Sequence, residues 1–220
     1  MPTPDPLPDA EGFRRFDLDG LTAKERYKLL IGSVVPRPIA WITTVNPEGR
    51  VNAAPFSFFN VLSSDPAIVG IGIENHSDGS PKDTGRNIRD TGEFTVNIAG
   101  RENLEAMNVT AVAFGPEVDE LQAAGLTARP GHRVKSPFIG EAPVALECVR
   151  HITLEISPTR AIVLGRVVAM HLRSDIVNER LHVDPVALDA LGRMGGAGYC
   201  RTDGVFDLAT PTLAQWQERG

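Results

Sequence analysis

The segment Asp78–Ile88 places a lysine among residues that start helices, a combination that can bind an anion. Ser80 can cap a helix, Pro81 suits the first helical position, and Asp83 completes a Ser-x-x-Asp capping box. Lys82 then falls in the first turn, where its positive charge opposes the helix dipole. An anion bound by Lys82 and the free N–H groups would remove that conflict, so the spacing favours a phosphate site. The alternative is a solvated surface helix that binds nothing.

A second segment, Arg37–Asn60, predicts a tight β-hairpin with an unusual second strand. Apolar residues alternate along the first strand, and residues 46–49 supply the turn. After the turn, small and polar residues stand where an ordinary core strand carries Val, Ile or Leu: Asn52, Ala53, Ala54, Pro55 and Ser57. A planar ligand could therefore lie against this strand. Because Pro55 has no N–H group, we expect the strand to lie at a sheet edge or to carry a bulge.

A framework of strands must position these two segments. Periodicity and turn residues predict strands at about residues 38–46, 51–58, 67–74, 93–99, 144–157 and 161–173. In the long pair at residues 144–173, apolar and polar residues alternate, which is typical of an antiparallel sheet with one buried face. Since strands and helices do not alternate regularly, a closed antiparallel barrel is favoured over a doubly wound sheet.

Capping residues and prolines mark the expected helix starts. Thr22 and Glu25 form a capping box, and we expect their helix to end at Gly32 in the left-handed conformation. Three later helices are expected to have proline at their first position: Pro81, Pro116 and Pro185. All are short, so the chain is predicted to be mainly β.

The composition is that of an ordinary globular domain, with 42% hydrophobic and 23% charged residues among 220. A net charge of −6 argues against nucleic acid or an anionic membrane as the partner. Two cysteines, Cys148 and Cys200, are too few for a disulfide framework, so reduced thiols and a cytoplasmic location are expected. We see no signal-like segment at the proline-rich start, and no apolar run approaches the roughly 18 residues of a membrane span.

No internal repeat or linker divides the chain. We expect an extended N-terminal arm over residues 1–20, one barrel domain over residues 21–210 and a C-terminal tail over residues 211–220. A chain of this length can bury a full core in one domain.

The five histidines do not indicate a metal site, because no His-x-x-x-His pair occurs and no acidic cluster accompanies them. His151 and His171 fall on strand faces and are expected to be surface or hydrogen-bonded residues. The glycine-rich stretch Gly192–Arg201 lacks the Rossmann spacing, so no dinucleotide fingerprint is predicted there.

Taken together, the motifs resemble those of the flavin reductase-like family, whose members are FMN-binding split barrels. The resemblance runs from about Tyr27 to Leu208. It rests on RPIAWITTV with Gly49 and Asn52, APFSFFN at residues 54–60, Asp65 with Pro66, DGSPKDTGRNI, GEFTVNI at 92–98, PVALEC at 143–148, and GRMGG followed by Tyr199. Each motif alone is weak, but the combination is specific.

The resemblance implies an antiparallel, Greek-key split barrel that binds FMN as a homodimer and takes electrons from NADH or NADPH. It assigns the flavin ring to Trp41, Thr43, Asn52, Ala53 and Ala54, where small side chains would let backbone N–H groups approach the ring edge. It assigns the ribityl and phosphate groups to Ser57, Phe58, Phe59, Asn60, Ser80, Lys82, Asp83 and Thr84. No acid–base triad is expected, because the flavin itself accepts the hydride. FAD is the alternative cofactor.

Several alternatives stay open within this interpretation. The protein could be a flavoredoxin-like electron carrier without nicotinamide turnover, or a non-catalytic flavin-binding barrel. A monooxygenase or another redox protein is a candidate partner. Trp41 could equally be a core residue, as most strand tryptophans are. His182 could touch a nicotinamide, and the loop with Tyr199 could either reach the ring or be an ordinary connection.

Overall fold

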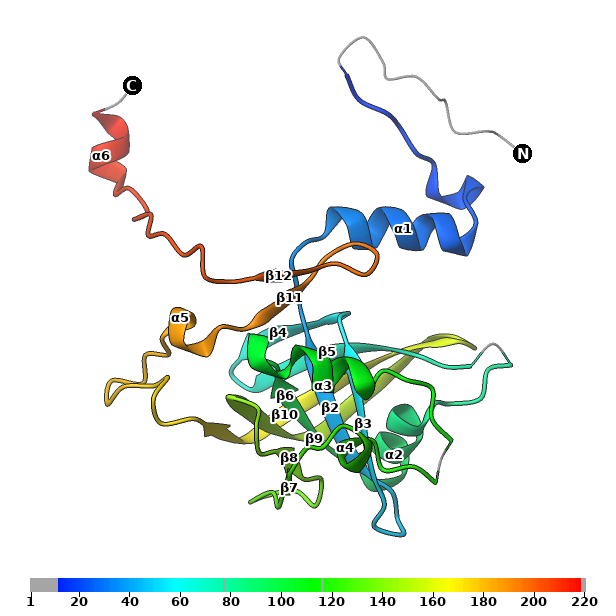
Figure 1. Cartoon of the computed structure of the whole chain (residues 1–220). Helices are drawn as coiled ribbons and strands as arrows, with labels where there is room; N and C mark the ends of the chain where they lie inside the picture. The colour runs from blue at the N-terminus through cyan, green and yellow to red at the C-terminus, as the bar shows by residue number, and fades with distance from the viewer. Residues whose placement is uncertain (1–11, 77, 116, 219–220) are drawn as a thin grey trace.

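A computed structural model describes residues 12–76, 78–115 and 117–218. Its centre is a seven-stranded antiparallel sheet in the order β3-β2-β6-β9-β10-β5-β4 (Figure 1). The strands are β2 (Ala40–Val45), β3 (Val51–Phe56), β4 (Phe59–Ser64), β5 (Ala67–Glu74), β6 (Glu93–Ile98), β9 (Val144–Ser157) and β10 (Arg160–Leu172). All the predicted strands are present, and the predicted mainly-β split barrel is confirmed.

The two edges of this sheet are neighbours in the chain. β3 ends at Phe56 and β4 begins at Phe59, so a two-residue link joins the edges. At this link the Gly72 N–H donates to the Phe58 carbonyl oxygen over 2.7 Å. No ladder pairs β3 with β4 among the described residues, which leaves the barrel split. Pro55 therefore lies on an edge strand, as its missing N–H group predicted.

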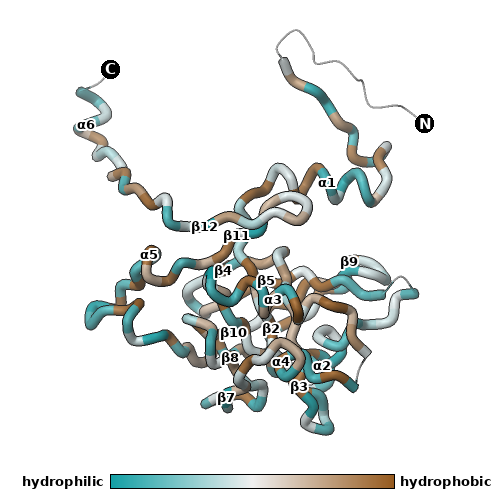
Figure 2. Tube along the Cα trace, viewed as in Figure 1, coloured by the Kyte–Doolittle hydropathy of each residue, from teal (hydrophilic) through white to brown (hydrophobic). Residues whose placement is uncertain are grey.

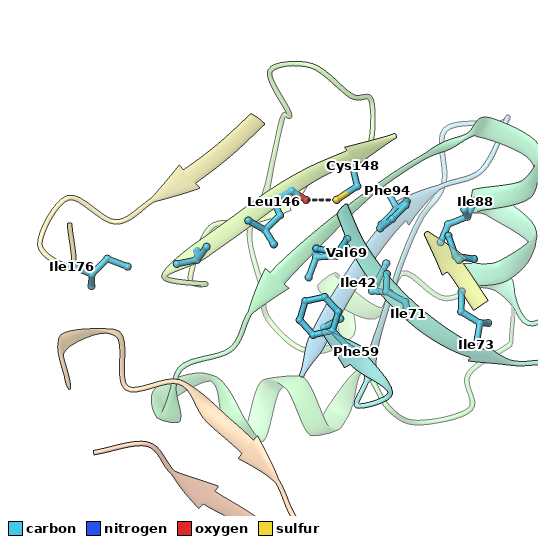
Figure 3. Close-up of a cluster of buried hydrophobic side chains, with 14 residues drawn as sticks. Ile42, Phe59, Val69, Ile71, Ile73, Ile88, Phe94, Leu146, Cys148 and Ile176 are labelled. Atoms are coloured by element: carbon cyan, nitrogen blue, oxygen red, sulfur yellow. Dashed lines mark hydrogen bonds between the residues drawn. The ribbon is translucent and has the colours of Figure 1, made fainter. Parts of the chain in front are cut away.

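The barrel encloses a hydrophobic core that includes Ile42, Ile71 and Phe94, all fully buried (Figure 3). Gly165 on β10 lies against the Phe94 ring, and a Cβ atom there would stand 2.3 Å from Phe94 Cζ. Cys148 belongs to the same core, and burial raises the pKa of its thiol to about 12. Both cysteines are free, as predicted, and Cys148 is inert at neutral pH.

The first helix, α1 (Ala23–Ser33), begins as predicted and ends differently. The Glu25 N–H donates to Thr22 Oγ1, and the Thr22 N–H donates to Glu25 Oε2, which completes the capping box. Gly32, however, lies inside the helix, and Val34 follows in an extended conformation. The physical reason is Arg37: its guanidinium donates to the Ile31 and Val34 carbonyl oxygens at 2.6 and 3.0 Å. A left-handed glycine is not needed to satisfy this helix end.

Of the three helix starts predicted at prolines, one is confirmed, one is corrected, and one falls outside the described residues. Helix α5 (Pro185–Leu188) begins at Pro185 behind an Asp184 cap, as expected. Helix α2 (Asp83–Thr91) begins two residues after Pro81, because the Ser80 hydroxyl donates to Asp78 and does not cap the helix. Helix α4 (Glu120–Ala123) begins behind an Asp119 cap, and the expected helix start at Pro116 lies outside the described residues.

Several short elements were not predicted. They include the helix α3 (Leu104–Val109) and the single turns Leu18–Gly20 and Arg101–Asn103. A small sheet joins β1 (Arg37–Pro38) to β11 (Leu191–Arg193) and β12 (Tyr199–Arg201), and a two-stranded sheet joins β7 (Ala128–Arg129) to β8 (Phe138–Ile139). The glycine-rich loop expected at residues 192–201 is therefore partly a β-hairpin. Elements of two or three residues carry too little periodicity to be recognised.

The described residues nearest the two termini extend away from the barrel (Figure 1). Of the predicted arm, residues 1–11 lie outside the described part, and residues 12–17 are irregular and mostly exposed. The C-terminal segment, residues 203–218, is exposed and ends in helix α6 (Leu213–Gln217), while residues 219–220 of the predicted tail are not described. None of the described helices has the length and apolarity to cross a bilayer.

Hydrogen bonds to buried polar groups hold the segment of residues 131–139 against the sheet. Glu147 on β9 has no exposed surface and accepts the N–H groups of His132, Arg133 and Val134 at 2.7, 2.5 and 3.0 Å. The His171 ring nitrogen lies 2.5 Å from the same carboxylate. Burial opposes ionisation of Glu147, but these hydrogen bonds outweigh it and lower its pKa to about 2.

Candidate functional site

A cavity of about 260 Å³ opens beside the edge strand β3. The start of α2 borders it, and so do residues 110–114, which follow α3. The cavity brings together six residues of the predicted site: Asn52, Ala53, Ala54, Lys82, Asp83 and Thr84. Segments that are distant in the sequence therefore meet at the strand that sequence analysis singled out.

The start of α2 has the features of the predicted anion site, although their arrangement differs slightly from the prediction. Lys82 is the N-cap residue and not part of the first turn, and no side chain caps the helix. The first N–H groups of a helix have no partner within it, so those of α2 are open to a ligand beside the Lys82 ammonium group. The Asp83 carboxylate is paired with Arg86, which limits its repulsion of an anion.

The floor of the cavity is formed by the small residues of β3. The Ala53 N–H faces away from β2 and donates to Glu120 Oε2 over 3.2 Å. Because neighbouring residues of an antiparallel ladder alternate in direction, the N–H of Ala54, which pairs with Ile42, faces β2. In this structure the Ala53 N–H is bonded to Glu120, and an approach of backbone N–H groups at Ala53 and Ala54 to a ring edge stays a prediction. Their small size still keeps the floor open.

Asn52 connects the walls of the cavity. When its amide nitrogen faces Glu120, it donates to Glu120 Oε1 over 3.3 Å, and its oxygen accepts the Thr84 hydroxyl over 2.9 Å. Glu120, Asn52 and Thr84 thus link α4, β3 and α2. Burial raises the pKa of the Glu120 carboxyl, and Asp83 and Asp119 raise it further, although backbone N–H groups oppose this shift.

Two predicted ring contacts lie behind the cavity wall. Trp41 and Thr43 are fully buried on β2. The indole N–H of Trp41 donates to Thr110 Oγ1 over 2.9 Å, and the Thr43 hydroxyl donates to the Pro137 carbonyl oxygen over 2.5 Å. Trp41 is therefore a core residue, which was the alternative that sequence analysis left open. It supports the segment of residues 110–114 from behind.

The remaining predicted residues do not line the cavity either. Phe59 belongs to the barrel core, and Phe58 packs edge-on against Tyr27 of α1 with 6.4 Å between ring centroids. Ser57 lies in the link between the sheet edges, whereas Asn60 and Ser80 are exposed. The Asn60 Oδ1 atom accepts the neighbouring Val61 N–H. Any flavin contact by these five residues stays a prediction.

Sequence analysis missed His76, residues 110–114 and Glu120, all of which line the cavity. His76 follows β5 in a turn next to the predicted helix start. Its short distance from Lys82 in the sequence was the one signal that could have placed it in the site. Residues 110–114 carry no pattern that marks a binding segment. Glu120 stands in an acidic stretch that is typical of a solvated helix start.

The other candidate residues lie elsewhere. His182, the guessed nicotinamide contact, and Tyr199 do not line the cavity, and the Arg193 guanidinium lies 4.4 Å from the centre of the Tyr199 ring. His171 is hydrogen-bonded, as expected of a satisfied strand residue. In the described part of the chain, no three His, Cys, Asp or Glu residues gather as a metal site would require.

The chain and its fold are similar to those of known proteins. Residues 31–192 match the flavin reductase like domain. An uncharacterized protein of Deinococcus radiodurans is 45% identical over 93% of this chain and 92% of its own. The structure is similar to nitrilotriacetate monooxygenase component B from Bacillus cereus, with TM-score 0.84, 31% identity, and coverage of 89% and 98% of the two chains. It is equally similar to the 2-nitrobenzoate 2-nitroreductase NbaA from Pseudomonas fluorescens, with TM-score 0.83, 36% identity, and coverage of 90% and 97%.

Proposed function

This chain belongs to the flavin reductase-like family, and on that premise we propose that it binds FMN and transfers hydride from NADH or NADPH to flavin. The observation that supports this proposal is the cavity where Lys82 and the uncapped start of α2 face the small residues of β3. One end offers positive charge and free N–H groups, and the other offers a flat, narrow strand. A phosphorylated planar cofactor needs both.

The residues of the cavity fit FMN by charge and by shape. Lys82 and the first N–H groups of α2 would bind the phosphate. Ala53 and Ala54 would leave room for the ring beside β3, and the Thr84 and Asn52 side chains would offer polar contacts. The bound flavin would supply the hydride acceptor, so the protein needs only to bind it, orient it and control access of water.

We expect purified protein to be yellow, or to become yellow when FMN is added, and to oxidise NADH or NADPH when free FMN is present. The measurement is the absorbance spectrum together with the steady-state loss of the nicotinamide band, compared with a protein-free flavin blank. Turnover no faster than the blank would refute the reductase activity. If FMN binds but neither nucleotide reduces it in a stopped-flow experiment, the electron-carrier alternative is correct. A protein that never binds FMN would favour the non-catalytic alternative.

A second candidate acceptor follows from the similarity to NbaA. At 36% identity over nearly the whole chain, that similarity favours a nitroaromatic acid as an electron acceptor beside free flavin. Reduction of 2-nitrobenzoate by the FMN-loaded protein with NADH or NADPH tests this acceptor directly. Nitrilotriacetate monooxygenase component B similarly supports a monooxygenase as the consumer of reduced flavin.

We also propose that the protein is a homodimer. Tyr27 and Leu30 lie on one face of α1, Val34 follows the last residue of this helix, and all three are exposed. Strand β4 exposes Val61 and Leu62. The C-terminal segment is exposed too and carries hydrophobic residues (Figure 2): Val205, Phe206, Leu208, Leu213 and Trp216. Monomeric proteins rarely expose so many large apolar side chains together, whereas a second copy would cover them.

Light scattering on the purified protein is expected to give twice the 23.7 kDa mass of one chain. The double variant Leu30→Asp/Val34→Asp should lower that mass toward a single chain, because each aspartate would bring an unpaired charge into the contact. Lys28→Gln, on the same helix, is the control and should leave the mass unchanged. An unaltered dimer in the double variant would exclude α1 from the interface.

A further inference from the structure

Glu120 is unusual among the acidic residues of this chain, because its side chain is nearly buried and lies next to the cavity. Only 8% of its surface is exposed. Helix α4, capped by Asp119, places it against the outer edge of β3, where a neighbouring strand would otherwise supply acceptors. One carboxylate oxygen takes the Ala53 N–H, and the other accepts the Asn52 amide. The carboxylate therefore accepts the hydrogen bond that a neighbouring strand would otherwise accept at this edge.

The contacts of Glu120 also affect the position of α2, because Asn52 links Glu120 to this helix. Its amide oxygen accepts the Thr84 hydroxyl, and Thr84 is the second residue of α2, immediately after Asp83. The start of α2, with Lys82 at its N-cap, is thereby held at a defined place relative to β3. A cavity that must hold a ligand by both of these elements depends on that placement.

We infer that Glu120 is a positioning residue for the flavin: it holds β3 and α2 in the arrangement that binds the cofactor, and its charge favours oxidised over reduced FMN. This inference rests on the proposed function. Reduced FMN carries more negative charge than oxidised FMN, so a carboxylate in the cavity wall is expected to weaken binding of the reduced form more.

Charged groups of both signs surround Glu120, and they stay in place when Glu120 alone is substituted. Asp83 and Asp119 add negative charge. Lys82 and His76 line the cavity, while Arg50 and Arg86 line a second hollow that adjoins it at Asn52, Asp83 and Glu120. Arg86 is paired with Asp83. Burial raises the pKa of Glu120, so acidification removes its charge at a higher pH than it would for an exposed glutamate.

Two substitutions separate the positioning role from the charge. Glu120→Gln keeps the shape and the acceptor for the Ala53 N–H but removes the charge. We expect the affinity of this variant for oxidised FMN to stay within about threefold of that of the unmodified protein. The ratio of its affinity for reduced FMN to its affinity for oxidised FMN should rise about tenfold, as Coulomb's law gives for the loss of a charge several ångströms away. The corresponding change is a more positive midpoint potential of the bound flavin. Glu120→Ala should in addition weaken oxidised FMN about tenfold or more, because β3 and α2 lose their link.

The experiment combines FMN titration by fluorescence with the midpoint potential of the bound flavin, and Glu117→Gln serves as control. Glu117 is an exposed acid in the same segment and does not line the cavity, so its variant should match the unmodified protein. An unchanged potential in Glu120→Gln would overturn the inference about charge. Additive effects of Glu120→Ala and Asn52→Ala on FMN affinity would overturn the positioning role, because residues in one network are coupled.

The outcomes also distinguish this inference from the proposed function. If the unmodified protein binds no FMN, the proposed function fails, and the inference fails with it. If the unmodified protein binds FMN and Glu120→Gln behaves identically in both measurements, only the role of Glu120 is refuted. A thermal melt of each apoprotein identifies a variant that has lost its fold, and in that case the shape-conserving Glu120→Gln decides.

Discussion

Replacing Lys82 with alanine is expected to weaken FMN binding by about 1 to 3 kcal/mol while leaving riboflavin binding nearly unchanged. Lys82 is the N-cap residue of α2 and lines the cavity. Its ammonium group and the uncapped N–H groups behind it would face the phosphate, which riboflavin lacks. Titration of the apoprotein with each flavin, followed by fluorescence, measures both affinities.

A suitable control for this prediction is Lys135→Ala, which removes an exposed lysine that does not line the cavity. Both flavins should bind this variant as they bind the unmodified protein. If Lys82→Ala weakened the binding of FMN and of riboflavin equally, the lysine would not contact the phosphate. The start of α2 would then not be the phosphate site. A raised salt concentration should also reduce the FMN preference, because the contact is electrostatic.

Glu147→Gln is expected to destabilise the folded protein by about 3 kcal/mol, since a buried carboxylate that accepts four hydrogen bonds loses half of its acceptors. The carboxylate receives three backbone N–H groups of residues 132–134 and the His171 ring. A glutamine amide turns an NH₂ group toward some of those donors, which leaves them unsatisfied. Urea denaturation followed by circular dichroism measures the loss. Glu155→Gln, an exposed acid on the same strand, should change stability by less than about 0.5 kcal/mol.

The same residue predicts how stability depends on pH. The pKa of Glu147 is lowered from 4.5 to about 2 in the folded protein. The carboxylate therefore stabilises the fold fully above about pH 4.5, and that contribution, about 3 kcal/mol, is lost as the pH falls from 4.5 toward 2. The unmodified protein should lose stability over this range more steeply than Glu147→Gln. Parallel pH profiles for the two proteins would contradict the assignment.

The predictions that held were those that depend on a few neighbouring residues. The capping box at Thr22 and Glu25 is local, since both residues lie within one helical turn. Pro55 implied an edge strand because the missing N–H group is a property of the residue itself. The alternation over residues 144–173 was sufficient to predict a long antiparallel pair.

The predictions that failed were those that depend on competition between possible partners. Ser80 was a good cap by its position, but its hydroxyl bonds to Asp78, so α2 starts later. Gly32 was a good helix end, but the Arg37 guanidinium satisfies the last carbonyl groups of α1 instead. Arg37 belongs to the small sheet beside the barrel, and the helix sequence does not show that its side chain contacts the end of α1.

The sequence by itself determined the family, the barrel class and the two segments that meet at the cavity, because their residue types and spacings are local properties. Only the tertiary structure decided which side chains face that cavity. Trp41 is the second residue of β2 and is fully buried, whereas Glu120 belongs to α4, far along the chain, and accepts a hydrogen bond from β3. Contacts of this kind arise when distant elements pack together, and no local pattern of hydrophobicity or capping encodes them.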